Sequence, residues 1–189
     1  MKDEIRRLIQ DSIKVKETVA RDEAGNIEKA AQAIVAAVRS GGKLLVFGNG
    51  GSAADSQHIA AEFVGRFKKE RKAIAAIALT TNTSAMSAIA NDYGYDTVFS
   101  RQVEALGRRG DVALGISTSG RSKNVVDAIN KAKALGLVTI SLIGAGGGIL
   151  AKESDISITV DSTDTPRIQE SHIMIGHIIC ELAEKELCK

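Results

Sequence analysis

Five short apolar segments recur along the chain, and stretches with helical patterns separate them. Each segment is a near-continuous run of Ile, Val, Leu and Ala, which is typical of strands buried on both faces of a parallel sheet. This alternation predicts an α/β fold with a doubly wound, flavodoxin-like, five-stranded parallel sheet flanked by helices. The predicted strands are Lys43–Phe47, Ala73–Leu79, Val112–Ile116, Val138–Ile143 and Ile156–Val160, and the predicted helices are Ala53–Phe67, Ser84–Asn91, Val98–Leu106, Asn124–Leu135 and Pro166–Leu187.

The segment before the first strand, residues 1–40, is predicted to form two further helices with a break near Gly25-Asn26. The second of them carries an apolar stripe from Ile27 to Val38 and ends at Gly41-Gly42. A helical pair ahead of an α/β unit needs a surface to pack on. That surface is either the neighbouring helices of the same domain or an identical subunit.

Composition narrows the class of protein. A chain of 189 residues, 44% hydrophobic, predicts one domain with a sizeable core. The 25 basic and 23 acidic residues are well mixed and aromatic residues are only 3%, so a nucleic-acid partner is not expected. No apolar run is long enough to span a membrane. Cys180 and Cys188 are interpreted as reduced thiols of a cytoplasmic protein, with Cys180 buried and Cys188 not.

Two polar loops each lie between a predicted strand and the start of a predicted helix. The first is Gly48–Ser52 and the second is Ser117–Ser122. A glycine-rich or hydroxyl-rich turn that opens a helix gathers unpaired N–H groups, so it attracts anions and phosphate above all. Ligands of doubly wound sheets bind at the carboxyl ends of the strands, where both loops fall. The loops therefore predict a site for a phosphorylated small molecule.

Each loop also has other interpretations. Gly48–Ala53 fits the dinucleotide fingerprint G-x-G-x-x-G/A, but no acidic residue ends the second predicted strand at Leu79–Asn82, so no nucleotide cofactor is predicted. In the second loop, Ser122 or Asn124 can be a helix cap and nothing more. The segment Gly115–Ser119 lacks the last glycine of a nucleophile elbow, which leaves serine hydrolysis unsupported.

Acid–base groups lie on two predicted helices. His58 and Glu62 are four residues apart and share a helix face, either as half of a metal site or as an exposed contact. On the last helix, Gln169 and His177 project within about 80° of one another, and His172 lies about 60° to the other side of Gln169. This geometry leaves both histidines open as candidates.

Taken together, these segments resemble the signature of the phosphoheptose isomerase family of sugar-isomerase (SIS) domains. The resemblance rests on Gly48–Phe67, Ala90–Gly94, Leu114–Ser122 and Arg167–His177, and it runs in order over essentially the whole chain. It implies a single SIS domain over residues 1–189 in a homotetramer with sites formed between subunits. The N-terminal helical pair, residues 1–40, would pack in that oligomer.

The family interconverts sedoheptulose 7-phosphate and D-glycero-D-manno-heptose 7-phosphate, the entry to heptose for lipopolysaccharide core. The resemblance implies that Glu62 is the base that moves a proton between C1 and C2 through an enediol or enediolate, and that His177 is the partner acid. It also implies zinc on His58, Glu62, Gln169 and His177. The implied phosphate contacts are Ser117, Thr118, Ser119 and Ser122, and the implied sugar contacts are Asn49, Gly50, Gly51, Ser52, Glu62, Arg66, Asn91, Asp92 and Gln169.

Two rival functions share this fold. One is a non-catalytic SIS binding module of the replication-initiator-associating type, which lacks the carboxylate at the position of Glu62; the presence of Glu62 favours the enzyme. The other is a sugar-phosphate sensor with the same pocket and no turnover. The glycine-rich segment Gly144–Gly148 is interpreted as a flexible turn without a chemical role.

Overall fold

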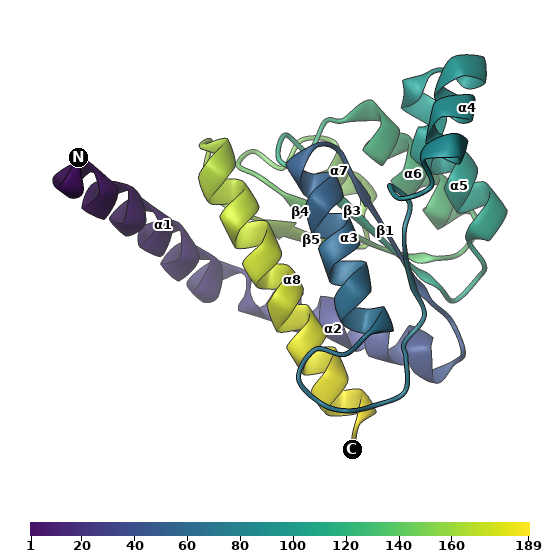
Figure 1. Ribbon diagram of the computed structural model, residues 1–189, viewed down its shortest axis with the longest axis horizontal. Coiled ribbons are helices and arrows are strands. Elements are labelled where there is room, and N and C mark those ends of the chain that lie inside the picture. Colours follow the sequence, from purple (N-terminus) through teal and green to yellow (C-terminus); the bar gives the residue numbers. More distant parts are fainter.

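A five-stranded parallel sheet forms the centre of the computed structural model, which describes residues 1–189 (Figure 1). The strand order is β2-β1-β3-β4-β5 and every neighbouring pair is parallel, which confirms the predicted fold class. The order reverses between β1 and β3, so the topological switch point lies there. The strands are β1 Leu44–Gly48, β2 Ala76–Ala78, β3 Val112–Ser117, β4 Val138–Ile143 and β5 Ile156–Thr159.

Helices cover both faces of this sheet, and each face has its own hydrophobic core. Leu44 and Val46 of β1 point into one core, whereas Leu45 and Phe47 point into the other, because successive strand side chains alternate between faces. That alternation explains why the strand reads as a continuous apolar run. The helices are α1 Lys2–Asp22, α2 Ala24–Arg39, α3 Gly51–Val64, α4 Thr83–Tyr93, α5 Val98–Leu106, α6 Lys123–Ala134, α7 Leu150–Glu153 and α8 Thr165–Leu187, with a 3₁₀ turn η1 at Tyr95–Thr97.

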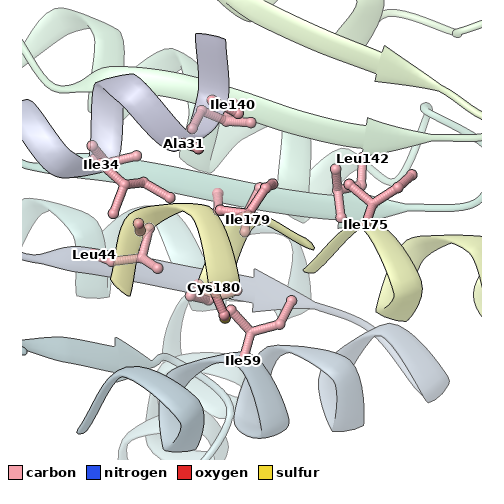
Figure 2. Close-up of a cluster of buried hydrophobic side chains, with 14 of the residues drawn as sticks. Ala31, Ile34, Leu44, Ile59, Ile140, Leu142, Ile175, Ile179 and Cys180 are labelled. Atoms are coloured by element: carbon pink, nitrogen blue, oxygen red, sulfur yellow. The ribbon is translucent and has the colours of Figure 1, made fainter. Parts of the chain in front are cut away.

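The first core joins α2, α3 and α8 to the sheet (Figure 2). Ile59 of α3 and Ile175 and Ile179 of α8 are at most 1% exposed there. The second core, on the opposite face, joins α5 and α6 to the sheet and includes the rings of Phe47 and Phe99, with centroids 5.5 Å apart. Helices α3 and α8 therefore lie together on one face, and α6 lies on the other.

Several element boundaries differ from the predicted ones by one to three residues; for example, α3 ends at Val64 instead of Phe67. The break between the first two helices falls at Glu23, which adjoins both helices, so Gly25-Asn26 lies in the first turn of α2. Helix α8 begins at Thr165 with Asp164 as its N-cap, one residue before the predicted start at Pro166. Strand β2 spans only Ala76–Ala78, because this edge strand pairs with β1 alone.

Helix α1 projects away from the rest of the chain (Figure 1). Its contacts with α8 include hydrogen bonds from Arg167 Nη1 to the carbonyl of Leu8 (2.7 Å) and from Ser12 Oγ to Glu170 Oε2 (2.7 Å). A row of apolar side chains on α1 stays exposed: Ile5, Leu8, Ile9 and Ile13. No helix of the structure combines the length and the apolar character needed to cross a bilayer.

Candidate active site

Two polar loops meet at the switch point of the sheet. The first follows β1 and leads into the N-terminus of α3; the second follows β3 and leads into the N-terminus of α6. Gly50 turns the first loop with a φ of +56°, a conformation that residues with a Cβ rarely adopt. Helices α3 and α6 lie on opposite faces of the sheet, but they begin just after the neighbouring strands β1 and β3. Their two N-termini therefore open near one point. Their unpaired N–H groups favour an anion there.

A pair of asparagine side chains joins the two loops. The amide of Asn49 donates to Asn124 Oδ1 and the amide of Asn124 donates to Asn49 Oδ1, both at 2.9 Å. Tyr95 of η1 donates its hydroxyl proton to Asn49 Oδ1 at 3.2 Å. Asn124 and Tyr95 were not among the predicted site residues. The position of Asn124, two residues after the serine-rich loop, was a signal that sequence reasoning interpreted only as a possible cap.

The second loop gathers serine hydroxyl groups. Ser117 Oγ lies 2.9 Å from Ser122 Oγ and 3.4 Å from Ser119 Oγ, and Ser119 Oγ accepts the N–H of Arg121 at 3.2 Å. Ser122 is the N-cap residue of α6, yet its hydroxyl makes no capping hydrogen bond. The hydroxyl therefore faces the loop, and a pure capping role does not describe it. The glycine-rich segment supports this loop from behind, because Ile149 and Leu150 donate their N–H groups to the carbonyl of Gly120.

Helices α3 and α8 run side by side and bring three polar side chains together (Figure 1). His58 Nε2 lies 3.0 Å from Glu62 Oε1, and His177 Nε2 lies 3.4 Å from His58 Nε2. One donor atom from each of these three residues, which together form the triad, lies within 4.8 Å of the others. Two imidazole nitrogens and a carboxylate oxygen at such distances are a donor set that suits zinc.

The two histidines of α8 occupy different environments. His172 is completely buried, and neither of its ring nitrogens has a hydrogen-bond partner. Burial lowers the pKa of His172 to about 4, so this ring is neutral at physiological pH. His177 is partly exposed and lies beside His58. The structure thus singles out His177, and not His172, as the histidine that faces the candidate site.

The remaining predicted residues lie at separate places in the structure. Gln169 lies against the first loop: a Cβ on Gly51 would come within 2.5 Å of Gln169 Nε2. It is two helical turns from His177, about 12 Å along the axis of α8. Arg66 is exposed, with Nε 3.8 Å from Glu70 Oε2. Asn91 donates to Asp92 Oδ1 at 2.8 Å on an exposed part of α4.

Asp55 is a further polar residue of α3 that was not predicted. Its Oδ2 atom is buried and has no hydrogen-bond partner. Burial raises the pKa of Asp55, and the nearby charge of His58 acts in the opposite direction. The signal in the sequence was helical spacing, since Asp55, His58 and Glu62 recur at intervals of three and four residues and so share a face.

Comparison with known proteins gives consistent matches over the full chain. The SIS domain family model matches residues 8–144. A phosphoheptose isomerase of Geobacter metallireducens is 54% identical over 189 residues and covers 100% of both chains. One from Sulfurimonas denitrificans is 51% identical over 99% of this chain and 97% of its own. The solved phosphoheptose isomerase of Neisseria gonorrhoeae is 42% identical, with a TM-score of 0.92 over 97% of this chain and 98% of that one.

Proposed function

Because this chain belongs to the phosphoheptose isomerase family of SIS domains and is an aldose–ketose isomerase, we propose that it converts sedoheptulose 7-phosphate to D-glycero-D-manno-heptose 7-phosphate with Glu62 as base and His177 as acid. The observation that carries the proposed roles is the triad. Helices α3 and α8 place the Glu62 carboxylate and the His177 imidazole around His58, with one donor atom of each within 4.8 Å of the others. A carboxylate beside an imidazole is the pairing that proton transfer next to a carbonyl requires.

The proposed reaction is a proton transfer within the open-chain sugar. Glu62 removes a proton from C1 of the ketose, which forms the C1–C2 double bond of an enediolate and moves charge onto the C2 oxygen. His177 donates a proton to that oxygen. Glu62 then returns its proton to C2, the C1 hydroxyl gives up its proton to His177, and the aldehyde forms at C1. Each positioned acid–base group contributes about 10²- to 10⁴-fold.

Phosphate binding is assigned to the second loop. Its four hydroxyl side chains, at Ser117, Thr118, Ser119 and Ser122, precede the N-terminus of α6, where unpaired N–H groups and the helix dipole favour an anion. The proposed sugar contacts come from the first loop, α3 and the residues after it, α4 and α8: Asn49, Gly50, Gly51, Ser52, Glu62, Arg66, Asn91, Asp92 and Gln169. Phosphate and reacting carbons would then lie at opposite ends of the substrate.

Zinc fits the donor atoms of the triad. His58, Glu62 and His177 would hold the ion, and Gln169 is the proposed fourth ligand. When bound, zinc supplies Lewis-acid polarisation of a carbonyl oxygen. Gln169 would have to leave its place against Gly51 to join the other three, because its amide lies at that loop.

The resemblance to the same family supports a proposal for the oligomeric state and the cellular role. We propose a homotetramer with sites at subunit interfaces, in which the exposed apolar row on α1 packs on another subunit. The proposed setting is the cytoplasm and the proposed pathway is lipopolysaccharide core biosynthesis. The rival function, a non-catalytic binding module, is disfavoured because Glu62 is present and lies beside His58.

Proton NMR of the purified protein with sedoheptulose 7-phosphate in D₂O tests the proposal. We expect an aldoheptose phosphate with deuterium at the carbon that receives the proton, and we expect Glu62→Gln to abolish it while sugar-phosphate binding survives. Glu104→Gln, the same change at an exposed side chain of α5, is the matched control and should behave as the wild type. Tight binding without product or exchange would overturn the isomerase and favour the binding module.

A further inference from the structure

A buried carboxylate ties the end of α8 to the segment that follows α3. Glu184 is 3% exposed. Its Oε1 atom accepts the backbone N–H of Phe67 at 3.0 Å, and its Oε2 atom accepts those of Lys68 at 2.8 Å and Lys69 at 2.9 Å. Three consecutive backbone donors therefore point at one side chain of a neighbouring helix.

Arg71 completes this arrangement from the other side. Its Nε atom donates to Glu184 Oε1 at 3.0 Å, and both charged side chains are at most 6% exposed. Its two terminal nitrogens donate to backbone carbonyls at the end of α3, namely those of Glu62 at 2.8 Å and Phe63 at 2.9 Å. One guanidinium thus connects α8 to the last turn of the helix that carries Glu62.

The tied segment reaches the acid–base groups through Phe67. The Phe67 ring lies against the His177 ring, with centroids 5.6 Å apart. His177 is seven residues before Glu184 on α8, so both side chains project from the same face, two turns apart. Glu184 accepts the N–H of Phe67, and the Phe67 ring in turn contacts one side of the His177 imidazole.

We propose that Glu184 and Arg71 are positioning residues for the isomerisation: they hold α3 against α8 and Phe67 against His177, and thereby fix the imidazole relative to the Glu62 carboxylate. This inference rests on the proposed function in the roles given to His177 and Glu62. Arg71 reaches Glu62 only at its backbone carbonyl, and neither Arg71 nor Glu184 hydrogen-bonds to the Glu62 carboxylate or the His177 ring. Desolvating a buried ion pair opposes its mutual attraction, so such pairs are weak evidence for stability alone, which makes a role in orientation a distinct hypothesis for this pair.

Glu184→Gln tests the inference, because glutamine keeps the shape but replaces one of the two acceptor oxygens by an NH2 group, which cannot accept the N–H bonds made to that oxygen. We expect kcat to fall about 10- to 100-fold with KM within about twofold, the pattern of a misplaced catalytic group. The matched control is Glu181→Gln on the same helix, whose carboxylate is 32% exposed and pairs with Lys68 and Lys185. It should leave kcat unchanged.

A second measurement does not depend on activity. In protein without metal or substrate, the nuclear Overhauser effect between the Phe67 and His177 rings should be strong in the wild type and in Glu181→Gln, and weakened or lost in Glu184→Gln. Unchanged kcat and ring contact in Glu184→Gln would overturn the inference. So would a loss of stability with both unchanged.

A further variant serves if Glu184→Gln does not fold. Phe67→Leu leaves the ion pair in place and removes the ring contact, and it should lower kcat with KM unchanged; an unchanged kcat would overturn the proposed route to His177. If the wild type shows no isomerase activity while the ring contact depends on Glu184, the proposed function has failed and the positioning contact stands.

Discussion

Gly148 lies directly against Gly120, so that a Cβ on Gly148 would be 2.4 Å from the Gly120 carbonyl oxygen and 2.8 Å from that of Ser119. Both glycines have a positive φ, +59° for Gly148 and +61° for Gly120. The glycine-rich turn after β4 therefore forms the floor of the serine-rich loop. It has a packing role that the sequence analysis did not assign to it.

Substituting Gly148, in the turn that packs against the serine-rich loop, should weaken phosphate binding. In Gly148→Ala the new methyl group would push the carbonyls of Gly120 and Ser119, so we expect KM to rise about tenfold or more with a smaller change in kcat. Gly146→Ala is the matched control, because Gly146 also has a positive φ of +79° but a Cβ there meets nothing within 4 Å. Steady-state kinetics of both variants checks the prediction. Equal KM values would mean that backbone strain alone, and not the contact with Gly120, matters.

The hydroxyl of Ser122 should matter for substrate and little for the fold. It makes no capping bond, so Ser122→Ala should change the free energy of unfolding by less than about 0.5 kcal/mol while raising KM. Asn82→Ala removes a true cap, since Asn82 Oδ1 accepts the N–H of Ala85 at 3.0 Å, and should cost about 1 kcal/mol. Urea denaturation of both variants compares the two. A larger loss in Ser122→Ala than in Asn82→Ala would contradict the geometry.

The two histidines of α8 should respond in opposite ways to substitution. His177→Gln is expected to lower kcat by about 10²- to 10⁴-fold. His172→Leu removes two buried nitrogens that have no partners, so its stability should stay within about 1 kcal/mol of the wild type or increase, with kcat retained. Thermal unfolding checks the stability of the two variants, and steady-state kinetics checks their kcat. Loss of turnover in a folded His172→Leu variant would show that the acid has been misassigned.

Acid should remove the stabilisation that Glu184 provides. Burial by itself raises the pKa of Glu184, but the N–H donors of Lys68, Lys69 and Phe67 and the charge of Arg71 outweigh it and lower the pKa overall. A lowered folded-state pKa means that the stabilisation is complete above the unfolded value and is lost as pH falls through the folded value. Breaking a buried ion pair is costly, so Glu184→Gln should lower the free energy of unfolding by about 3 kcal/mol at pH 7. Because the wild type loses this stabilisation in acid, the difference between the two proteins should shrink steadily below about pH 4.5.

Added salt should affect the buried carboxylate of Glu184 and the exposed carboxylate of Glu181 differently. The pKa of Glu181 is lowered to about 2 by Lys68 and Lys185, all on the surface. In about 1 M NaCl the screening length falls to about 3 Å, so the effect of Glu181→Gln on the urea midpoint should vanish while that of Glu184→Gln persists. Equal sensitivity of both variants to salt would show that Glu184 is accessible to solvent ions.

The architecture could be predicted from the sequence because the signals for it are local. Strands buried on both faces read as unbroken apolar runs, and the polar loops stand where such strands end. The local signals were weakest at the ends of elements. Gly25-Asn26 predicted the break between α1 and α2 two residues too late, since the break lies at Glu23. A short helix break can occur at any residue with suitable dihedral angles.

The parts of the site that depend on tertiary contacts were out of reach. Helical spacing left His172 and His177 equivalent, and only burial under the sheet-facing side of α8 distinguishes them. The reciprocal Asn49–Asn124 pair joins positions 75 residues apart, and no periodicity indicates it. The positioning of Phe67 by Glu184 across 117 residues is another contact of this kind.

The pairing of α3 with α8 also sets the order in which the protein can mature. All five strands and the second core lie before residue 161, so that half of the molecule can organise while the chain is still being made. The first core needs Ile175, Ile179 and Ala183, and His58 meets His177 only after α8 has been synthesised. Before the last helix docks, that face of the sheet is covered only in part, by α2 and α3. A chain that stopped between residues 161 and 176 would therefore contain all five strands and both polar loops but lack one of the three donor residues.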